Sequence, residues 1–151
     1  MPELDYAFLA DAADARPGQK FSVLGGGITR IGGPGFPLHH PHLALVIGLT
    51  IGSAELGRSH EIQFALQAPD GSELSRAQAG IQADGPVGGE AQLTFAVDLW
   101  NLTFPTQGDY SIRVFVNGSE RRRLTLGVYR GEGGQAGSGV VPPFPPPTGR
   151  A

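Results

Sequence analysis

Residues 91–130 read AQLTFAVDLWNLTFPTQGDYSIRVFVNGSERRRLTLGVYR, and this stretch decides the fold class. Apolar side chains alternate with more polar ones in three consecutive runs, which is the period of a β-strand with one buried face. The apolar positions are Leu93, Phe95, Val97 and Leu99, then Tyr110, Ile112, Val114 and Val116, then Leu124, Leu126 and Val128. Three antiparallel strands with one apolar face need a second layer to cover that face. The stretch therefore predicts part of a two-layer β-sandwich.

The turn between the last two runs raises a question of register. Asn117-Gly118 is a strong signal for a two-residue hairpin turn. A regular hairpin with that turn would place Arg121 and Arg123 opposite core-facing residues, and burying an unpaired charge costs several kcal/mol. We therefore expect either a three-residue loop or a bulge that shifts the register by one residue. Both solutions place Ile112 opposite Leu124.

The rest of the chain contains five further strand candidates. These are Leu4–Asp11, Phe21–Ile31 with three glycines inside it, Leu43–Ile51, Ile62–Ala68 and Leu74–Ala83. The third is apolar on both faces and is expected to be central, whereas the fifth is polar and alanine-rich and is expected to be an edge. About eight strands, with no amphipathic helix of three turns, predict an all-β, antiparallel, immunoglobulin-like sandwich.

Composition limits the class of protein. A chain of 151 residues fits one domain with its own core, and 24 glycines and 13 prolines suit short strands joined by turns. A net charge of −3 offers no basic surface for nucleic acid. The absence of cysteine excludes disulfides and thiolate metal sites. The first residues lack the features of a signal peptide and the longest apolar run is about half a membrane span, so we expect a cytoplasmic protein without membrane contact.

The composition changes after Arg130. Residues 131–139 are rich in glycine, and residues 142–147 are five prolines and Phe144, a pattern that favours polyproline II conformation. We therefore divide the chain into a sandwich domain, residues 1–130, and a C-terminal arm, residues 131–151.

Two resemblances add to this interpretation. Phe104-Pro105, Gly108 and Tyr110, followed by an alternating run, resemble the penultimate strand of immunoglobulin-like sandwiches, in which a tyrosine at that corner hydrogen-bonds back to the backbone. The resemblance implies a fold and no activity. The buried disulfide and core tryptophan of antibody domains are absent from the pattern.

The second resemblance lies in the first 50 or so residues. It rests on PELDYAxLAD at residues 2–11, VLGGG at residues 23–27, and Phe36-Pro37 before a His-Pro pair. These motifs resemble an uncharacterised family of short bacterial proteins, which the rest of the sandwich matches more loosely and the arm does not. The resemblance implies a shared fold without an assigned activity.

Three histidines form the one metal-capable cluster in the sequence: His39, His40 and His42. Two or three histidines with a carboxylate can hold zinc or iron. A loop that leads into a strand is also an ordinary place for solvated histidines. The cluster supports the alternative function, a small-ligand or metal-binding protein that is possibly catalytic.

Three aromatic residues fall on a sheet face opposite the core positions: Trp100, Phe115 and Tyr129. Such residues can form a contact surface, or can pair across strands and stabilise the sheet. Phe144 in the arm could dock on that surface of a neighbouring subunit or pair with a sheet edge. We therefore predict a non-enzymatic structural or binding module without a cofactor, which self-associates as a homo-oligomer or binds another protein.

Overall fold

The computed structural model describes residues 2–16, 19–85 and 88–131, and within them the chain forms nine strands and one short 3₁₀ helix. The strands are β1 (Glu3–Asp14), β2 (Ser22–Ile28), β3 (Arg30–Gly33), β4 (Leu38–Ile51), β5 (Ser59–Gln67), β6 (Glu73–Gln82), β7 (Ala91–Phe104), β8 (Gly108–Val116) and β9 (Ser119–Arg130), and the 3₁₀ helix is η1 (Ser53–Glu55). No helix of the described residues is long and apolar enough to cross a membrane. The all-β prediction is confirmed.

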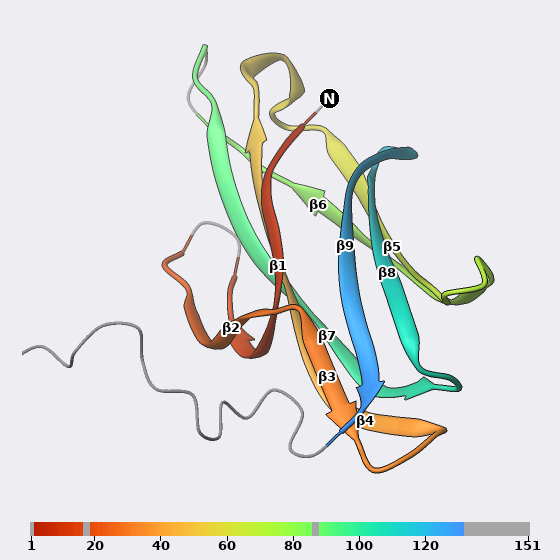
Figure 1. Cartoon of the computed structure of the whole chain (residues 1–151). Coiled ribbons are helices and arrows are strands. Elements are labelled where there is room, and N and C mark those ends of the chain that lie inside the picture. Colours follow the sequence, from red (N-terminus) through yellow and green to blue (C-terminus); the bar gives the residue numbers. More distant parts are fainter. Residues whose placement is uncertain (1, 17–18, 86–87, 132–151) are drawn as a thin grey trace, which may run out of the picture.

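The strands form two sheets packed as a sandwich (Figure 1). The first sheet has the order β2-β1-β4-β7, and the second has the order β3-β9-β8-β5-β6. Neighbouring strands are antiparallel except for β3 and β9, which run parallel. The expectation of a wholly antiparallel sandwich was therefore wrong at this one pair.

The parallel pair arises where the chain crosses between the sheets. The sequence predicted one interrupted strand over Phe21–Ile31, but the structure divides it at Thr29 into β2 of the first sheet and β3 of the second. Gly25 and Gly27 have φ values of 60° and 82°, which residues with a side chain rarely adopt. The glycines lie within the β1–β2 pairing, which shifts register beside them and continues to Ile28 before the chain crosses to the other sheet.

Strand β4 is central in the first sheet, as predicted, with β1 and β7 on its two sides. Its core-facing side chains are almost completely buried. On the opposite face, Ala44 and Val46 are also fully buried. A Cβ atom at Gly48 would lie only 2.2 Å from the ring of Tyr6, which covers this position. Aromatic side chains of β1 thus cover the outer face of the central strand.

The corner before β8 has the predicted hydrogen bonds. Tyr110 is fully buried; its hydroxyl donates to the carbonyl of Thr106 at 2.6 Å and accepts from the Thr106 N–H at 3.2 Å. Its ring meets Phe104 edge to face, with centroids 4.9 Å apart. Tyr110 therefore connects the end of β7 to β8.

The β8–β9 hairpin uses the bulge and not the longer loop. Val116 pairs with Ser119 across a two-residue turn, and the register shifts between Val114 and Phe115. Ile112 lies opposite Leu124, as expected. The three-residue loop was wrong because the bulge alone keeps apolar residues on the core face.

Candidate functional site

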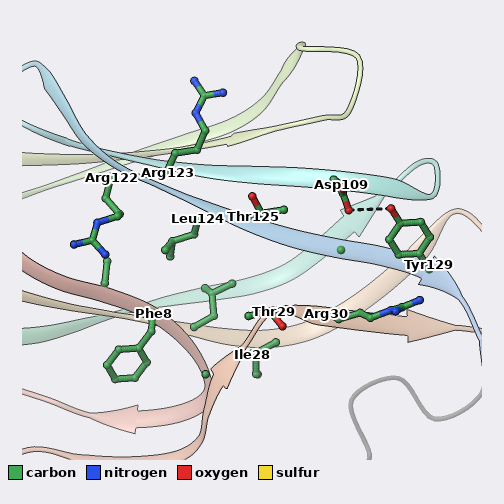
Figure 2. Close-up of a pocket in the computed structure, with 14 residues that line it drawn as sticks. Phe8, Ile28, Thr29, Arg30, Asp109, Arg122, Arg123, Leu124, Thr125 and Tyr129 are labelled. Carbon is green, nitrogen blue, oxygen red and sulfur yellow. Dashed lines mark hydrogen bonds between the residues drawn. The ribbon is translucent and has the colours of Figure 1, made fainter.

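A groove of 760 Å³ opens between β1 of the first sheet and β9 of the second (Figure 2). Its apolar lining comes from both sheets: Phe8 and Leu9 of β1, Ile28 of β2 and Leu124 of β9. The crossing residue Thr29 also lines it. The groove therefore lies directly beside the point where the chain passes from one sheet to the other.

The crossing explains why the groove exists. Strand β2 pairs with β1 only from Leu9 onward, and β3 pairs with β9 only from Gly127 onward. Within the described residues, residues 3–8 of β1 and 119–126 of β9 thus have no neighbouring strand on this side. The Gly127 N–H donates to the Thr29 carbonyl at 2.9 Å and fixes the crossing. Both sheets consequently present a free strand edge to the same groove.

The backbone of β9 has hydrogen-bonding capacity along this edge. Successive N–H and C=O groups of a strand point alternately to its two sides. Since the Gly127 N–H points toward the crossing, the backbone groups of Thr125 and Arg123 point the same way. An extended segment lying in the groove could therefore pair with β9 in continuation of β3.

Arginines lie toward the two ends of the groove and differ in their contacts. Arg122 points from β9 toward β1 on the side of Phe8 (Figure 2), and no hydrogen bond or ion pair joins it to another described residue. Arg30 lies over the ring of Tyr129, 5.0 Å from its centroid. The groove thus combines apolar side chains with three arginines, since Arg123 also lines it and pairs with Glu120. Arg122 is the arginine of this lining without a partner among the described residues.

Tyr129 has a carboxylate partner at the same end of the groove as Arg30. Its hydroxyl donates to Oδ1 of Asp109 at 2.9 Å, and this hydrogen bond raises the pKa of Tyr129. The bond favours the neutral phenol because a carboxylate can only accept. Tyr129 therefore stays a hydrogen-bond donor and a neutral ring at the edge of the groove.

The three histidines lie on β4, so the predicted loop was wrong. Strand β4 begins at Leu38 and continues through Pro41, which has no partner in the register with β7. Strand β1 pairs with β4 only from Ala44 onward, so the missing N–H of Pro41 interrupts no ladder with β1. The opposing residue Asn101 has a φ of 52° and adapts β7 to this interruption.

The histidines have separate partners. Nδ1 of His39 lies 3.1 Å from the Thr103 hydroxyl, and burial lowers the pKa of His40. Nδ1 of His42 lies 2.9 Å from the Asp11 carbonyl, and its Nε2 lies 2.7 Å from Oδ1 of Asp98. Among the described residues, no three histidine or acidic side chains gather as metal ligands would. His42 instead joins β1, β4 and β7.

The predicted interface aromatics do not share one surface. Trp100 lies on the first sheet, is 65% exposed, and stacks on His42 with centroids 4.2 Å apart. Phe115 and Tyr129 lie on the second sheet. Phe115 lies between the guanidinium groups of Arg76 and Arg113, 5.2 and 5.0 Å from its ring centroid. Phe144 lies outside the described residues.

The sequence reasoning missed the groove, although a signal for it was present. The glycines at 25–27 marked an irregularity inside the strand candidate Phe21–Ile31, but the segment was predicted as one strand. The lining residues are ordinary apolar residues and arginines, which carry no catalytic or metal-binding motif. Only the pairing of β3 with β9 shows that two strand edges meet there.

Comparison with known proteins identifies the family. The model of a family of unknown function (DUF6941) matches residues 5–129. The chain belongs to this family. The match extends across the whole sandwich, further than the N-terminal resemblance alone, and it ends before the arm. No curated protein matches the chain.

Two solved structures are distantly similar. The alkylpurine DNA glycosylase AlkC of Pseudomonas fluorescens, bound to DNA with an abasic-site analogue, has 12% identity and a TM-score of 0.43, and the match covers 85% of this chain and 30% of that chain. The C-terminal domain of wzt has 10% identity and a TM-score of 0.43, with 84% and 72% covered. Similarity this distant carries no argument about function.

Proposed function

We propose that this chain is a non-enzymatic protein-binding module that self-associates by receiving the C-terminal arm of a second copy in the β1–β9 groove. The observation that carries the proposal is the pair of free strand edges along a partly apolar groove that holds Arg122, which has no partner among the described residues. Extended polypeptide segments bind to such edges through backbone hydrogen bonds and through pockets for alternate side chains. The proposal keeps the expected cytoplasmic location.

The sequence of the arm suits the groove. Val140 and Val141 can pair with the strand edge through their backbone N–H groups and supply apolar side chains. The prolines around Phe144 have no N–H to donate, and they favour an extended backbone that presents the Phe144 ring and loses little entropy on binding. Glu132 is the one acidic residue between positions 131 and 151, and Arg122 offers it a partner. Of the aromatic residues predicted to form an interface, Tyr129 lines this groove.

The direction of the chain favours the arm of another copy. Strand β9 runs along the groove from Arg122 to Tyr129, and the Gly131 N–H donates to the Gly33 carbonyl at 2.9 Å beyond its end. The arm therefore leaves the sandwich heading away from its own groove and would have to reverse to enter it. A second copy needs no such reversal.

The lining of the groove supports a binding role over catalysis. Its described residues include no histidine or serine, and the carboxylate of Asp109 already accepts a hydrogen bond from Tyr129. Nucleophilic catalysis needs a nucleophile, a base and an orienting group held together. The alternative function at His39, His40 and His42 gains no support from their geometry, because His39 and His42 bond different residues and no metal-ligand group forms among the described residues.

The test is binding of a labelled peptide with the sequence of residues 131–151 to a shortened chain that ends at Gly131. We expect an affinity in the micromolar range, reduced about tenfold by Arg122→Glu in the protein or Phe144→Ala in the peptide. Lys20→Glu, a matched charge reversal in the exposed turn between β1 and β2, should leave the affinity unchanged.

Light scattering of the full chain completes the test. We expect the full chain to form assemblies whose mass rises with concentration, and the shortened chain to lose this rise. A peptide that does not bind, or that binds equally well to the Arg122→Glu protein, would overturn the groove assignment. A peptide that binds while the full chain keeps a constant monomer mass would show that each arm occupies its own groove, and self-association through the arm would be wrong.

A further inference from the structure

Strand β6 is the edge of the second sheet and is exposed on both of its faces. It pairs with β5 on one side, and no strand of the described residues pairs with its other side. Of its ten residues, only Ile81 is buried. An edge strand that is exposed over this length presents a row of free backbone donors and acceptors.

The inner face of β6 is also incompletely covered. Ser75, Ala77 and Ala79 lie opposite buried residues of β5, so their side chains face the side of the core, yet the first two are exposed. Ser75 and Ala77 line a small apolar slot together with Phe64, Leu66, Leu99, Leu102 and Ile112. The first sheet has four strands and the second has five, and β6 is the strand left without a cover.

This edge has fewer features that prevent pairing than the other edges. Natural edge strands are protected by lysine, proline, bulges, inward charges or short length. Strand β3 has four residues, β2 contains two glycines with positive φ, and β7 is interrupted at Asn101. Strand β6 contains no lysine or proline, and its two charges neutralise each other because Arg76 bonds Glu73 at 2.7 Å. The edge is thus long, neutral and free to pair.

We propose that β6 pairs antiparallel with β6 of a second copy about a two-fold axis at Gln78, which joins the two five-stranded sheets into one. A two-fold interface brings the same surface together from both copies, so the strand must complement itself. Centring on Gln78 places the two Gln78 amides opposite each other, Ala77 opposite Ala79, and Arg76 opposite Gly80. Centring on Arg76 would place two guanidinium groups opposite each other, which is unfavourable.

A second copy fits this edge better than an unrelated segment. The strand carries no net charge that would select a partner of opposite sign, and its inward side chains are small on both copies. Pairing through Ala77 and Ala79 would extend each apolar slot with the same small side chains from the partner. The contact is separate from the β1–β9 groove and does not depend on the proposed arm interaction.

The chain contains no cysteine, so a single introduced thiol reports the contact without background. Full-length Gln78→Cys protein should form a disulfide-linked dimer under mild oxidation, since directly opposite Cα atoms of antiparallel strands lie about 4.5–5.5 Å apart. Ser53→Cys, at an exposed position in η1, is the control and should stay monomeric on a denaturing gel.

Exchange of charge at the axis tests the same contact without oxidation. Gln78→Lys and Gln78→Glu each place like charges opposite each other and should weaken the dimer at least tenfold in Kd. An equal mixture of the two variants should restore dimerisation as a heterodimer. Misfolding of the two variants would not give this pattern, because mixing two misfolded proteins does not restore a dimer.

The outcomes separate the two proposals. Cross-linking of Gln78→Cys no faster than Ser53→Cys, or charge variants that do not recover on mixing, would overturn the β6 contact. Peptide binding in the groove should be unaffected by Gln78→Lys. Absence of peptide binding to the chain ending at Gly131, together with efficient cross-linking of Gln78→Cys, would overturn only the arm proposal.

Discussion

The sandwich is open on two sides, and the two openings differ in what they expose. At the β1–β9 side, strands β1 and β9 lack neighbouring strands along the same stretch, which leaves a groove of 760 Å³ with Arg122 and Tyr129 in its lining. At the β6 side, one sheet extends past the other, which leaves a free backbone edge beside a slot of only 30 Å³. The first opening suits a segment with large side chains, and the second suits a strand with small ones.

The difference has its origin in the course of the chain. The groove results from a strand that is divided between the two sheets, so its shape depends on the crossing at Thr29. The β6 edge results from an extra strand at the end of one sheet, so its shape depends on the β5–β6 hairpin alone. Changes at the crossing should therefore affect one opening and spare the other.

The largest effect is expected from Ile28→Asp. Ile28 is 5% exposed and lines the groove just before the crossing, so an aspartate there would bury a carboxylate without a partner. We expect the free energy of unfolding to fall by about 3–5 kcal/mol, measured by urea titration. Ile28→Val should cost about 1 kcal/mol. Equal stability of the two variants would mean that the crossing is not packed as described.

A smaller effect is expected from Tyr110→Phe, which should lower the stability of the whole sandwich without changing either opening. The substitution leaves the backbone groups of Thr106 without the partner that the Tyr110 hydroxyl provides, at a cost of about 1–3 kcal/mol. Thermal unfolding should show the loss, while peptide binding and Gln78→Cys cross-linking below the transition stay unchanged. Tyr6→Phe, which removes a hydroxyl bonded to Thr94, gives a comparison on the other sheet.

Arg122→Ala should weaken binding at the β1–β9 groove alone, without changing the stability of the sandwich or the β6 contact. Arg122 has no partner among the described residues, so its removal should leave the free energy of unfolding within about 0.5 kcal/mol of wild type. The affinity for the arm peptide should fall about fivefold, and the β6 cross-link should persist. A large loss of stability would show instead that Arg122 supports the sandwich.

The smallest effect is expected from Glu120→Gln, on the outer face and outside the lining of both openings. The hydrogen bond from Arg113 lowers the pKa of Glu120, with Arg123 as a second cation nearby. A lowered folded pKa adds stability above the unfolded pKa of about 4.5, and this stability is lost as the pH falls through the folded value. At pH 7 we expect a cost of about 0.5 kcal/mol, since the pair is partly exposed.

The pH dependence checks the sign of this effect. Chemical unfolding of wild type and Glu120→Gln should give different midpoints at pH 7, and the midpoints should converge as the pH falls below the unfolded pKa of about 4.5. Glu90→Gln, at an exposed position on a loop, is the matched control. A difference that grows on acidification would contradict the assigned pairing of Glu120 with Arg113.

Sequence reasoning succeeded where the decisive interactions are local. The alternation in β8 and β9, the charge cost of the arginines and the corner at Tyr110 all act within about 25 residues, and each was confirmed. The polar composition of β6 correctly placed it at an edge. These features are determined mainly by residues that are close together in the sequence.

The wrong predictions concern segments whose structure depends on pairing with strands that are distant in the sequence. Residues 21–31 have the local pattern of one interrupted strand, and only the partners β1 and β9 decide that its halves belong to different sheets. The segment around Pro41 looked irregular, yet pairing with β7 holds it extended. The groove and its free edges follow from these two pairings, so no local motif could indicate the candidate site.

The strand order of the second sheet has one further consequence. Strands β3 and β6 are its two ends, and the arm leaves beside β3 at Gly131. A pair of molecules joined at β6 would therefore carry its two arms at opposite ends of one continuous sheet, about ten strands or 45 Å apart. Such a pair is bivalent, and its arms could link it to two further pairs, so that assembly would continue in one dimension until a ring closed or the ends were blocked.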